Sequence, residues 1–460
     1  MNPPFSKVMK FGGSCLGEGD ALRRLAAIVA REASPPALVV SALPGVTDRL
    51  LEATVTAERR PDSATAIAAD LTALHLRVAR KIAGSTAPTT RLEREIALLG
   101  EQLERSLLAV AFGGEVTAGL RATVASIGER WSARLVAAAL EGAQVRSMAV
   151  DADRLLVTRG DAREDARVDL AASKRKRAAA LGICRHAGAL PVFTGFFGAT
   201  VRGQVATFGR NGSDYSAAVL AVLLGARELE IWKDVPGFAT ADPKLVSGTH
   251  PLPRLTFAEA AELAYFGAAI LHPRTLEPLA GRSVRLRLRS IHAPAAPGTE
   301  IDPEGSFSGP EIKSVSVNPA IAVVRAEGPG VGIHPGVIGR TGDALAGAGI
   351  NIVSILTAQT SINLLVARDD AERSVEALRP LVGEAIERLS VRRELSLLAV
   401  VGEGMSRQHG VAGRIFSAVS RAGVNVEMIV SGASDVATYF LVRGPEVGLA
   451  LRALHRELFP

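Results

Sequence analysis

The sequence is poor in cysteine and aromatic residues, and it contains no long apolar run. Its 460 residues include two cysteines, Cys15 and Cys184, whose separation suggests neither a disulfide framework nor a metal-ligand cluster. That usage favours a reduced, cytoplasmic setting. Residues 1–10 hold no apolar segment typical of secretory signals, and no apolar stretch approaches the roughly 18 residues of a membrane span. We therefore expect a soluble chain with no membrane partner.

The chain also lacks a strong excess of charge of either sign. Its net charge of +6 is small for this length, and aliphatic residues dominate while aromatic residues make up 4%. This composition argues against intrinsic disorder. The densest basic run, residues 174–177, falls within a helical pattern, where a solvated helix face is a better interpretation than a nucleic-acid site. No nucleic-acid partner is expected.

The first 300 residues alternate short apolar segments with helical patterns. The pattern predicts helices at residues 20–31 and through most of 62–112. It predicts strands at residues 7–11, 37–42, 122–126, 145–150, 190–194 and 228–232. Alternation of this kind indicates an α/β fold, in which a mostly parallel sheet is covered by helices.

The composition changes near residue 295, where proline, glycine and serine become frequent. We predict a first domain at residues 1–295, a linker at 296–314, and two small modules at 315–392 and 393–460. The modules are suggested by an internal repeat, because residues 336–357 align without a gap with residues 410–431. Each copy is predicted to form a strand, a helix, two strands and a helix. Two copies indicate paired sheets with a ligand pocket between modules rather than a solenoid.

A glycine-containing turn at residues 208–216 is the strongest indication of chemistry. It presents Arg210, Ser213 and Asp214 directly before an apolar helix. Backbone amides at the start of a helix attract anions, and the planar guanidinium of an arginine suits a carboxylate or a phosphate. An acid in the middle of such a turn suggests a group that positions a lysine or a metal. The turn therefore predicts an anion site.

Other short motifs occur in a fixed order along the chain. They are Lys-Phe-Gly-Gly-Ser at 10–14, Val-Val-Ser-Ala at 39–42, Gly-Val-Thr at 45–47, Gly-Glu at 128–129, Thr-Gly-Phe-Phe-Gly at 194–198, Trp-Lys-Asp-Val-Pro-Gly at 232–237, Ala-Asp-Pro-Lys at 241–244, Phe-Gly-Ala at 266–268 and Leu-His-Pro at 271–273. With the turn and the repeat, this series resembles the aspartate kinase family over nearly the whole chain. The resemblance implies an amino acid kinase-type sheet sandwiched by helices, followed by two ferredoxin-like ACT regulatory modules.

The resemblance implies ATP-dependent phosphorylation of the β-carboxylate of L-aspartate to 4-phospho-L-aspartate, the first step toward lysine, threonine, methionine and isoleucine. A carboxylate with an ordinary pKa of about 4 is already an ionised nucleophile at neutral pH, so the reaction needs no general base. Catalysis must then come from positioning and charge neutralisation. Magnesium is implied as well, arriving chiefly on the phosphates of ATP, and no dedicated metal site is expected.

The resemblance assigns the catalytic roles to the first strand and to the turn. Lys10 would reach the transferred phosphate, and Asp214 would organise Lys10. Gly12 and Gly13 would let backbone amides approach the phosphates closely, with Ser14 beside them.

The amino-acid substrate would be held by a second group of residues. Arg210 would bind its α-carboxylate, and Glu129 would bind its ammonium group. An exposed glutamate at the start of a helix is the alternative interpretation of Glu129. Hydroxyl contacts and an aromatic wall would come from Ser41, Thr47, Ser213 and Phe196.

Nucleotide contacts are expected from Asp234, Asp242 and Lys244, with loop and cap residues as the alternative. The family usually has a lysine that contacts the ATP phosphates where this chain has Ala269. Lys233, at a position where the family commonly has threonine, or Arg274 could replace that charge.

The departure at Ala269 leaves two other classes open. One is a kinase for another amino acid, and the other is a weakly active or non-catalytic amino-acid-binding regulator. The ACT modules imply feedback by an amino acid, lysine or threonine, and a homodimer or larger assembly. Asn351, Ser354 and Asn425 are candidates for effector contacts, although asparagine is also simply favoured in tight turns.

Overall fold

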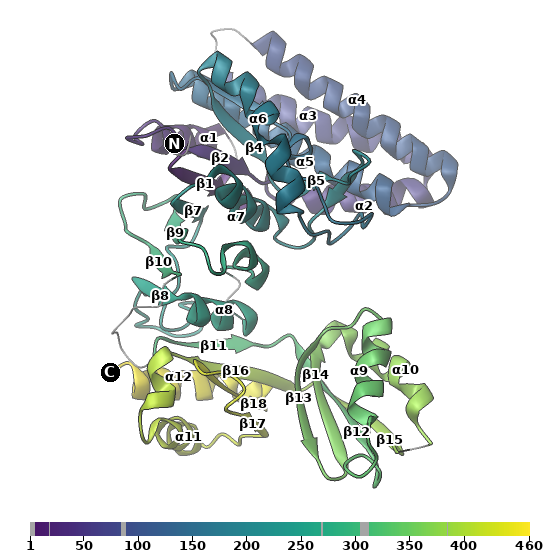
Figure 1. The fold of residues 1–460 in the computed structure, drawn as a ribbon, viewed down its shortest axis with the longest axis vertical. Helices are drawn as coiled ribbons and strands as arrows, with labels where there is room; N and C mark the ends of the chain where they lie inside the picture. The colour runs from purple at the N-terminus through teal and green to yellow at the C-terminus, as the bar shows by residue number, and fades with distance from the viewer. Residues whose placement is uncertain (1–4, 18, 84–88, 268–269, 304–311, 384) are drawn as a thin grey trace. The chain divides into compact units, whose positions relative to one another are not determined.

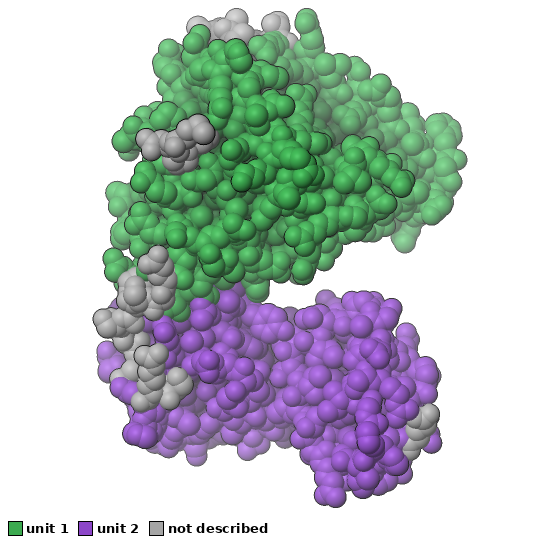
Figure 2. Space-filling model, viewed as in Figure 1, with its two compact units in different colours: residues 1–238, 253–257, 270–306 green, residues 239–252, 258–269, 307–460 purple. Residues whose placement is uncertain are grey.

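The computed structural model describes residues 5–17, 19–83, 89–267, 270–303, 312–383 and 385–460 (Figure 1). The chain divides into two compact units (Figure 2). The first unit comprises Met1–Phe238, Pro253–Phe257 and Ile270–Ser306, and the second comprises Ala239–Leu252, Ala258–Ala269 and Phe307–Pro460.

An eight-stranded sheet forms the centre of the first unit, with the order β3-β4-β2-β1-β7-β9-β10-β8. All its described pairings are parallel except the one between β9 and β10. The strands are β1 (Lys7–Phe11), β2 (Ala37–Val40), β3 (Ser147–Val150), β4 (Leu190–Thr194), β7 (Glu228–Lys233), β8 (Arg254–Thr256), β9 (Arg285–Ser290) and β10 (Thr299–Asp302). A small hairpin is added by β5 (Phe197–Ala199) and β6 (Val205–Thr207). The α/β class predicted from the alternating pattern is confirmed.

Helices cover both faces of this sheet. They are α1 (Gly19–Val29), α2 (Val46–Arg59), α3 (Ala64–Ala83), α4 (Thr89–Gly113), α5 (Ala118–Gly142), α6 (Leu170–Ala187) and α7 (Gly212–Leu224). Met9 and Phe11 belong to the apolar core formed with α1 to α5. Because successive side chains of a strand alternate between faces, Lys10 points to the opposite side, where α7 packs on β1. The strand therefore directs its lysine toward the start of α7.

One element prediction was wrong. Residues 122–126, predicted as a strand, lie within α5. Thr117 caps the start of this helix, where its side chain accepts a hydrogen bond from the amide of Leu120 at 3.2 Å. This helix packs against the sheet and against four other helices, so it is buried almost all around. A buried helix lacks the one-sided apolar pattern that distinguishes a helix from a buried strand. Glu129 consequently lies in the middle of a helix and does not follow a strand.

The predicted linker also contains more regular structure than its composition indicated. Thr299–Asp302 forms β10, which pairs with β9 and β8 in the main sheet. Residues 304–311, the proline-, glycine- and serine-containing remainder, lie outside the described residues. A short strand in a proline-rich neighbourhood carries little sequence signal, because its partners determine its pairing.

The second unit holds two four-stranded antiparallel sheets and, apart from its first residue, the helix α8 (Phe257–Tyr265). One sheet has the order β13-β14-β12-β15 and the other β11-β16-β18-β17. The first comprises β12 (Ile321–Glu327), β13 (Ile352–Ala358), β14 (Ser361–Ala367) and β15 (Arg388–Arg392), with α9 (Val337–Gly347) and α10 (Ala371–Leu378). The second comprises β11 (Ser314–Asn318), β16 (Leu395–Val401), β17 (Met428–Val430) and β18 (Ala437–Arg443), with α11 (Val411–Arg421) and α12 (Val447–Leu458). The predicted order of strand, helix, strand, strand and helix is confirmed in both copies.

Glycine geometry explains which positions the two repeats share. Gly336 and Gly410 precede α9 and α11 with φ of +84° and +85°. Gly349 and Gly423 follow the same helices with φ of +69° and +73°. Left-handed backbone conformations favour glycine, so the helix starts and ends in both modules retain it.

Among the described residues, no helix is both long enough and apolar enough to cross a membrane.

The buried histidine of α3 gives a prediction about acid stability. His75 stacks on Trp131 at 4.0 Å between ring centroids and donates from Nδ1 to the carbonyl of Leu71 at 2.7 Å. Burial lowers the pKa of His75 to about 4. Between about pH 6.5 and pH 4, His75 is therefore protonated in the unfolded chain and neutral in the folded chain. As the pH drops through this range, His75 should lower the free energy of unfolding by about 1.4 kcal/mol per pH unit.

His75→Phe should make the unfolding free energy depend less steeply on pH in this range, because about one proton fewer is taken up on unfolding. Urea unfolding followed by tryptophan fluorescence measures it, because both tryptophans of the chain, Trp131 and Trp232, belong to the first unit. His186→Phe is the matched control, since His186 makes a similar bond to the carbonyl of Gly182 but is exposed. Equal slopes in the two variants would contradict the prediction.

Candidate active site

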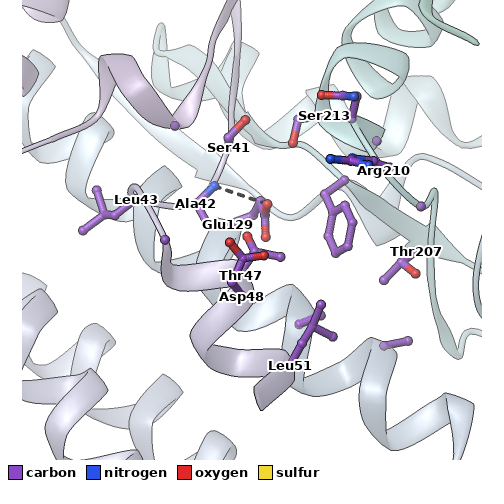
Figure 3. A pocket seen from close by; sticks show the side chains of 18 of the residues that line it. Ser41, Ala42, Leu43, Thr47, Asp48, Leu51, Glu129, Thr207, Arg210 and Ser213 are labelled. Carbon is purple, nitrogen blue, oxygen red and sulfur yellow. Dashed lines mark hydrogen bonds between the residues drawn. The ribbon is translucent and has the colours of Figure 1, made fainter. Parts of the chain in front are cut away.

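A cavity of about 790 Å³ opens in the first unit at the carboxyl ends of β1 and β2 (Figure 3). Its walls come from the segment after β2, from α5, from the end of β4, and from the turn before α7. All residues predicted to hold the amino acid line it: Ser41, Thr47, Glu129, Phe196, Arg210 and Ser213. Gly13 and Ser14 line it as well. Figure 3 shows Arg210 and Ser213 on one side of this space and Glu129 and Thr47 across from them. Residues from distant parts of the sequence therefore meet at one site.

Backbone strain is concentrated at the same cavity. Among the described residues, four that are not glycine have a positive φ, and three of them line the cavity: Asp165 at +50°, Phe196 at +69° and Asn211 at +56°. Such conformations persist only where the surrounding structure enforces them, and they cluster at functional sites. The strain supports the assignment of the cavity as the functional site.

Asp214 joins two lysines beside this cavity. It lies in the first turn of α7, is buried, and forms an ion pair through one oxygen with Lys10. Its other oxygen lies 3.3 Å from Nζ of Lys233, which also donates to the carbonyl of Ile270. Burial alone would raise the pKa of Asp214, but the charges and hydrogen bonds of the two lysines hold it below its ordinary value.

The cluster keeps a net positive charge because one carboxylate neutralises only one of the two ammonium groups. α7 begins directly behind it, after Asn211, whose side chain forms no capping hydrogen bond within the part of the chain that the structure describes. An uncapped helix start adds a partial positive charge and free amides. The cluster can therefore attract a polyanion while Asp214 fixes the positions of both lysines.

The glycines after β1 keep the space beside Lys10 free. A Cβ added to Gly12 would lie 3.5 Å from Nζ of Lys10, and one added to Gly13 would lie 3.1 Å from the carbonyl oxygen of Ala42. The amide of Gly12 donates to the carbonyl of Trp232 at 3.1 Å, which ties the end of β1 to β7. These features fit a polyphosphate, whose oxygens could approach Lys10 without a side chain in the way.

Glu129 is held inside the molecule rather than at an exposed helix start, so that alternative interpretation was wrong. It is 2% exposed, and its Oε1 accepts a hydrogen bond from the amide of Ala42 at 3.2 Å, while its Oε2 has no hydrogen-bond partner among the described residues. Burial raises the pKa of Glu129 to about 8, although the bond from Ala42 and the charge of Lys10 oppose this shift. A cationic ligand in the cavity would favour the ionised form of this buried, half-satisfied carboxyl group, which makes the group suited to bind such a ligand.

Gly128 explains why Glu129 reaches the end of β2. A Cβ at Gly128 would lie 2.8 Å from the Cβ of Ala42 and 3.3 Å from a methyl group of Val46. Only glycine allows α5 to approach this closely. Gly128 and Glu129 therefore act together: the glycine lets α5 pack close to the end of β2, and the carboxyl group of Glu129 can then accept a hydrogen bond from the amide of Ala42.

The two candidates for replacing the lysine missing at residue 269 differ clearly in their surroundings. Lys233 lies in the cluster with Lys10. Arg274 is engaged elsewhere, since its guanidinium donates to the carbonyl of Phe208 at 2.6 Å and pairs with Asp165. These partners favour Lys233 over Arg274 as the source of the missing phosphate charge, which stays a prediction. Ala269 itself lies outside the described residues.

The predicted nucleotide contacts are divided between the units. Asp234 belongs to the first unit and accepts a hydrogen bond from Ser14 at 3.2 Å. Asp242 and Lys244 belong to the second unit, where the carboxylate of Asp242 accepts the amide of Lys244 at 2.9 Å. That bond makes Asp242 a turn residue, as the alternative interpretation had it. A nucleotide contact by these three residues stays a prediction.

The candidate effector residues all lie in the second unit. The hydroxyl of Ser354 is 3.3 Å from that of Tyr439, which links β13 of one module to β18 of the other. Asn425 donates to Glu427 at 3.4 Å. Asn351 stands just before β13. Effector contacts by these residues stay a prediction.

Sequence reasoning missed one wall of the cavity, the segment 158–168. It is held on β6 by two backbone bonds of 2.9 Å, from the amide of Thr207 to the carbonyl of Arg163 and from the amide of Ala166 to the carbonyl of Thr207. Glu164 of this segment lines the cavity opposite Arg121, with 3.6 Å between the charged atoms. No motif in the sequence marks this segment.

Comparisons with known proteins show the family of the chain. The amino acid kinase family matches residues 6–290, and an ACT domain family matches residues 324–380 and 398–458. Aspartokinase 3, chloroplastic, of Arabidopsis thaliana is 30% identical, over 98% of this chain and 81% of the relative. Bifunctional aspartokinase/homoserine dehydrogenase 1, chloroplastic, of the same plant is also 30% identical over 98% of this chain. The chain spans about half the length of such bifunctional relatives, 51% in that case.

A solved structure shares nearly the whole architecture. E. coli aspartokinase III in complex with aspartate and ADP matches with a TM-score of 0.84 and 27% sequence identity, over 99% of this chain and 100% of that one. The same enzyme in complex with lysine and aspartate matches with a TM-score of 0.81 and 28% identity. The chain belongs to the amino acid kinase family and, within it, to the aspartokinases that carry ACT modules.

Proposed function

We propose that the chain is an aspartate kinase, which transfers the γ-phosphoryl group of ATP to the β-carboxylate of L-aspartate and yields 4-phospho-L-aspartate and ADP. The observation that carries the proposal is that the Lys10–Asp214–Lys233 cluster lies beside a cavity that is lined by both Arg210 and Glu129. E. coli aspartokinase III, similar over the whole chain, binds aspartate and ADP.

The cavity offers a partner for each fixed group of the amino acid. The guanidinium of Arg210 would bind the α-carboxylate, and Glu129 would bind the ammonium group. Ser41, Thr47 and Ser213 would add hydroxyl contacts, and Phe196 would close one side. The β-carboxylate would remain as the free nucleophile, already ionised at neutral pH.

Charge neutralisation would come from the two lysines and from the amides around Gly12 and Gly13. ATP supplies the phosphoryl group, and Mg²⁺ would shield its charge. The described residues include no group of three or more potential metal-ligating side chains, so we expect the ion to be held mainly by the phosphates. Asp214 would keep Lys10 and Lys233 in place as the phosphoryl group passes to the acceptor carboxylate and negative charge builds up on the β–γ bridging oxygen that leaves with ADP.

The ACT modules support a regulated enzyme. E. coli aspartokinase III has been solved with lysine bound. We therefore propose feedback by an end-product amino acid, lysine or threonine, in a pathway that begins with aspartate. A homodimer or larger assembly through the ACT modules and a cytoplasmic location complete the proposal.

Ala269 favours one alternative, a divergent relative that uses another amino acid or has lost catalysis. Acyl-phosphate trapping with hydroxylamine, together with ADP release, should distinguish these cases in a panel of aspartate, glutamate and homoserine. We expect hydroxamate and ADP with aspartate, and inhibition by lysine or threonine but not by methionine. Product formation with another amino acid but not with aspartate would identify that amino acid as the substrate. If none of the amino acids gives product, a non-catalytic regulator would be favoured.

A further inference from the structure

The side chain of Arg274 connects three separate segments behind the cavity. Arg274 follows Pro273 in a short 3-10 helix and is nearly buried. Its Nη1 donates to the carbonyl of Phe208 at 2.6 Å and pairs with the carboxylate of Asp165. Its Nη2 donates to the carbonyls of Asp165, at 3.2 Å, and of Ala166. The guanidinium also lies over the ring of Tyr215, 4.7 Å from its centroid.

These partners flank the segment that carries the anion-binding residues. Phe208 stands two positions before Arg210, and Tyr215 follows Asp214 in the first turn of α7. One planar group thus contacts both ends of the turn that presents Arg210, Ser213 and Asp214. A lysine could not do this, because a single ammonium group cannot bond to several acceptors in one plane and stack on a ring.

The third segment, 158–168, is fixed to the same turn through Asp165. This residue has a left-handed backbone, with φ of +50°, and it lines the cavity. A Cβ added to Gly209 would lie 2.5 Å from its Oδ1. Glycine at 209 therefore leaves room for the carboxylate that Arg274 grips, immediately beside Arg210.

We propose that Arg274 is a positioning residue for substrate recognition, which sets the Arg210 turn and the 158–168 wall at the distance that fits the amino acid. The proposal rests on the proposed function, in which Arg210 binds the α-carboxylate. Arg274 does not touch the substrate, and the phosphate cluster is held independently by Asp214. Its loss should therefore weaken binding of the amino acid far more than binding of the nucleotide.

Arg274→Lys tests this inference, because it keeps the charge and removes the planar fork. We expect the KM for aspartate to rise about tenfold while the KM for ATP changes less than twofold. Hydrogen exchange at the amides of residues 209–214 should become about tenfold faster. Arg167→Lys is the matched control: Arg167 belongs to the 158–168 segment that Arg274 contacts, but it is not one of the residues lining the cavity, and its side chain is exposed and only distantly paired with Glu277, at 3.8 Å.

A merely structural role would lower the unfolding temperature and leave the aspartate KM equal to that of Arg167→Lys, which would overturn the proposal. If the unaltered chain phosphorylates no aspartate, the proposed function fails by itself. The exchange rates then decide the role of Arg274, since an unchanged rate at 209–214 would show that it does not hold the turn.

Discussion

Replacement of Lys233 by methionine is expected to lower the turnover number at least a hundredfold while leaving the fold and aspartate binding nearly intact. Asp214 neutralises one of the two lysines that it contacts, so the cluster depends on Lys233 for its net positive charge. Removing one preorganised group that stabilises transition-state charge costs about 10²–10³ in rate. Steady-state kinetics at saturating aspartate and ATP measure the change.

Two further variants separate charge from local structure. Lys233→Gln keeps a donor for the carbonyl of Ile270 but loses the charge, and it should be about as slow as Lys233→Met. Lys176→Met removes an exposed lysine of α6 and should change nothing. Turnover of Lys233→Gln near that of the unaltered chain would show that Lys10 alone neutralises the phosphates.

Local signals explain what could be predicted from the sequence. The strand that carries Lys10 near its end, the glycines after it, and the turn at 208–216 are each defined by neighbouring residues. Glycines that allow unusual backbone conformations, and a charged residue at the end of a strand, can be recognised from a few consecutive residues of the sequence. The six residues to which the family resemblance assigned substrate binding line one cavity.

The remaining features depend on distant parts of the chain. Residues 122–126 form part of a helix because other helices and the sheet surround them, and an apolar run alone does not reveal that. Arg274 binds residues more than 60 positions away, so its sequence neighbours gave no hint of its partners. The raised pKa of Glu129 likewise results from burial, which no local pattern reports.

Glu129→Gln is the second variant with a large expected effect. In the free protein the carboxyl group, with a pKa of about 8, is mostly neutral at pH 7. An ammonium ligand needs the carboxylate, so binding of aspartate should release about one proton, and its affinity should rise about tenfold per pH unit up to pH 8. The glutamine cannot supply that charge. The Glu129→Gln variant should therefore bind aspartate about a hundredfold more weakly than the unaltered chain at pH 8, with an affinity that does not depend on pH.

Calorimetric titration in two buffers of different ionisation enthalpy measures both the affinity and the proton released. Glu141→Gln, an exposed glutamate of the same helix, should behave like the unaltered chain. Aspartate binding by the unaltered chain with no proton release at pH 7 would contradict a neutral Glu129.

The same substitution should stabilise the protein in alkaline solution even as it weakens binding. The pKa of Glu129 is higher in the folded chain than in the unfolded chain, so its contribution to stability is complete below about pH 4.5 and is lost as the pH rises through about 8. A glutamine loses nothing over this range because it has no proton to release. At pH 9, urea should therefore unfold Glu129→Gln at a higher concentration than it unfolds the unaltered chain. A variant less stable than its parent at that pH would mean that the carboxylate is already well solvated in the fold. The two measurements together would show that this buried acid weakens the free protein and is retained because its substrate carries a positive charge.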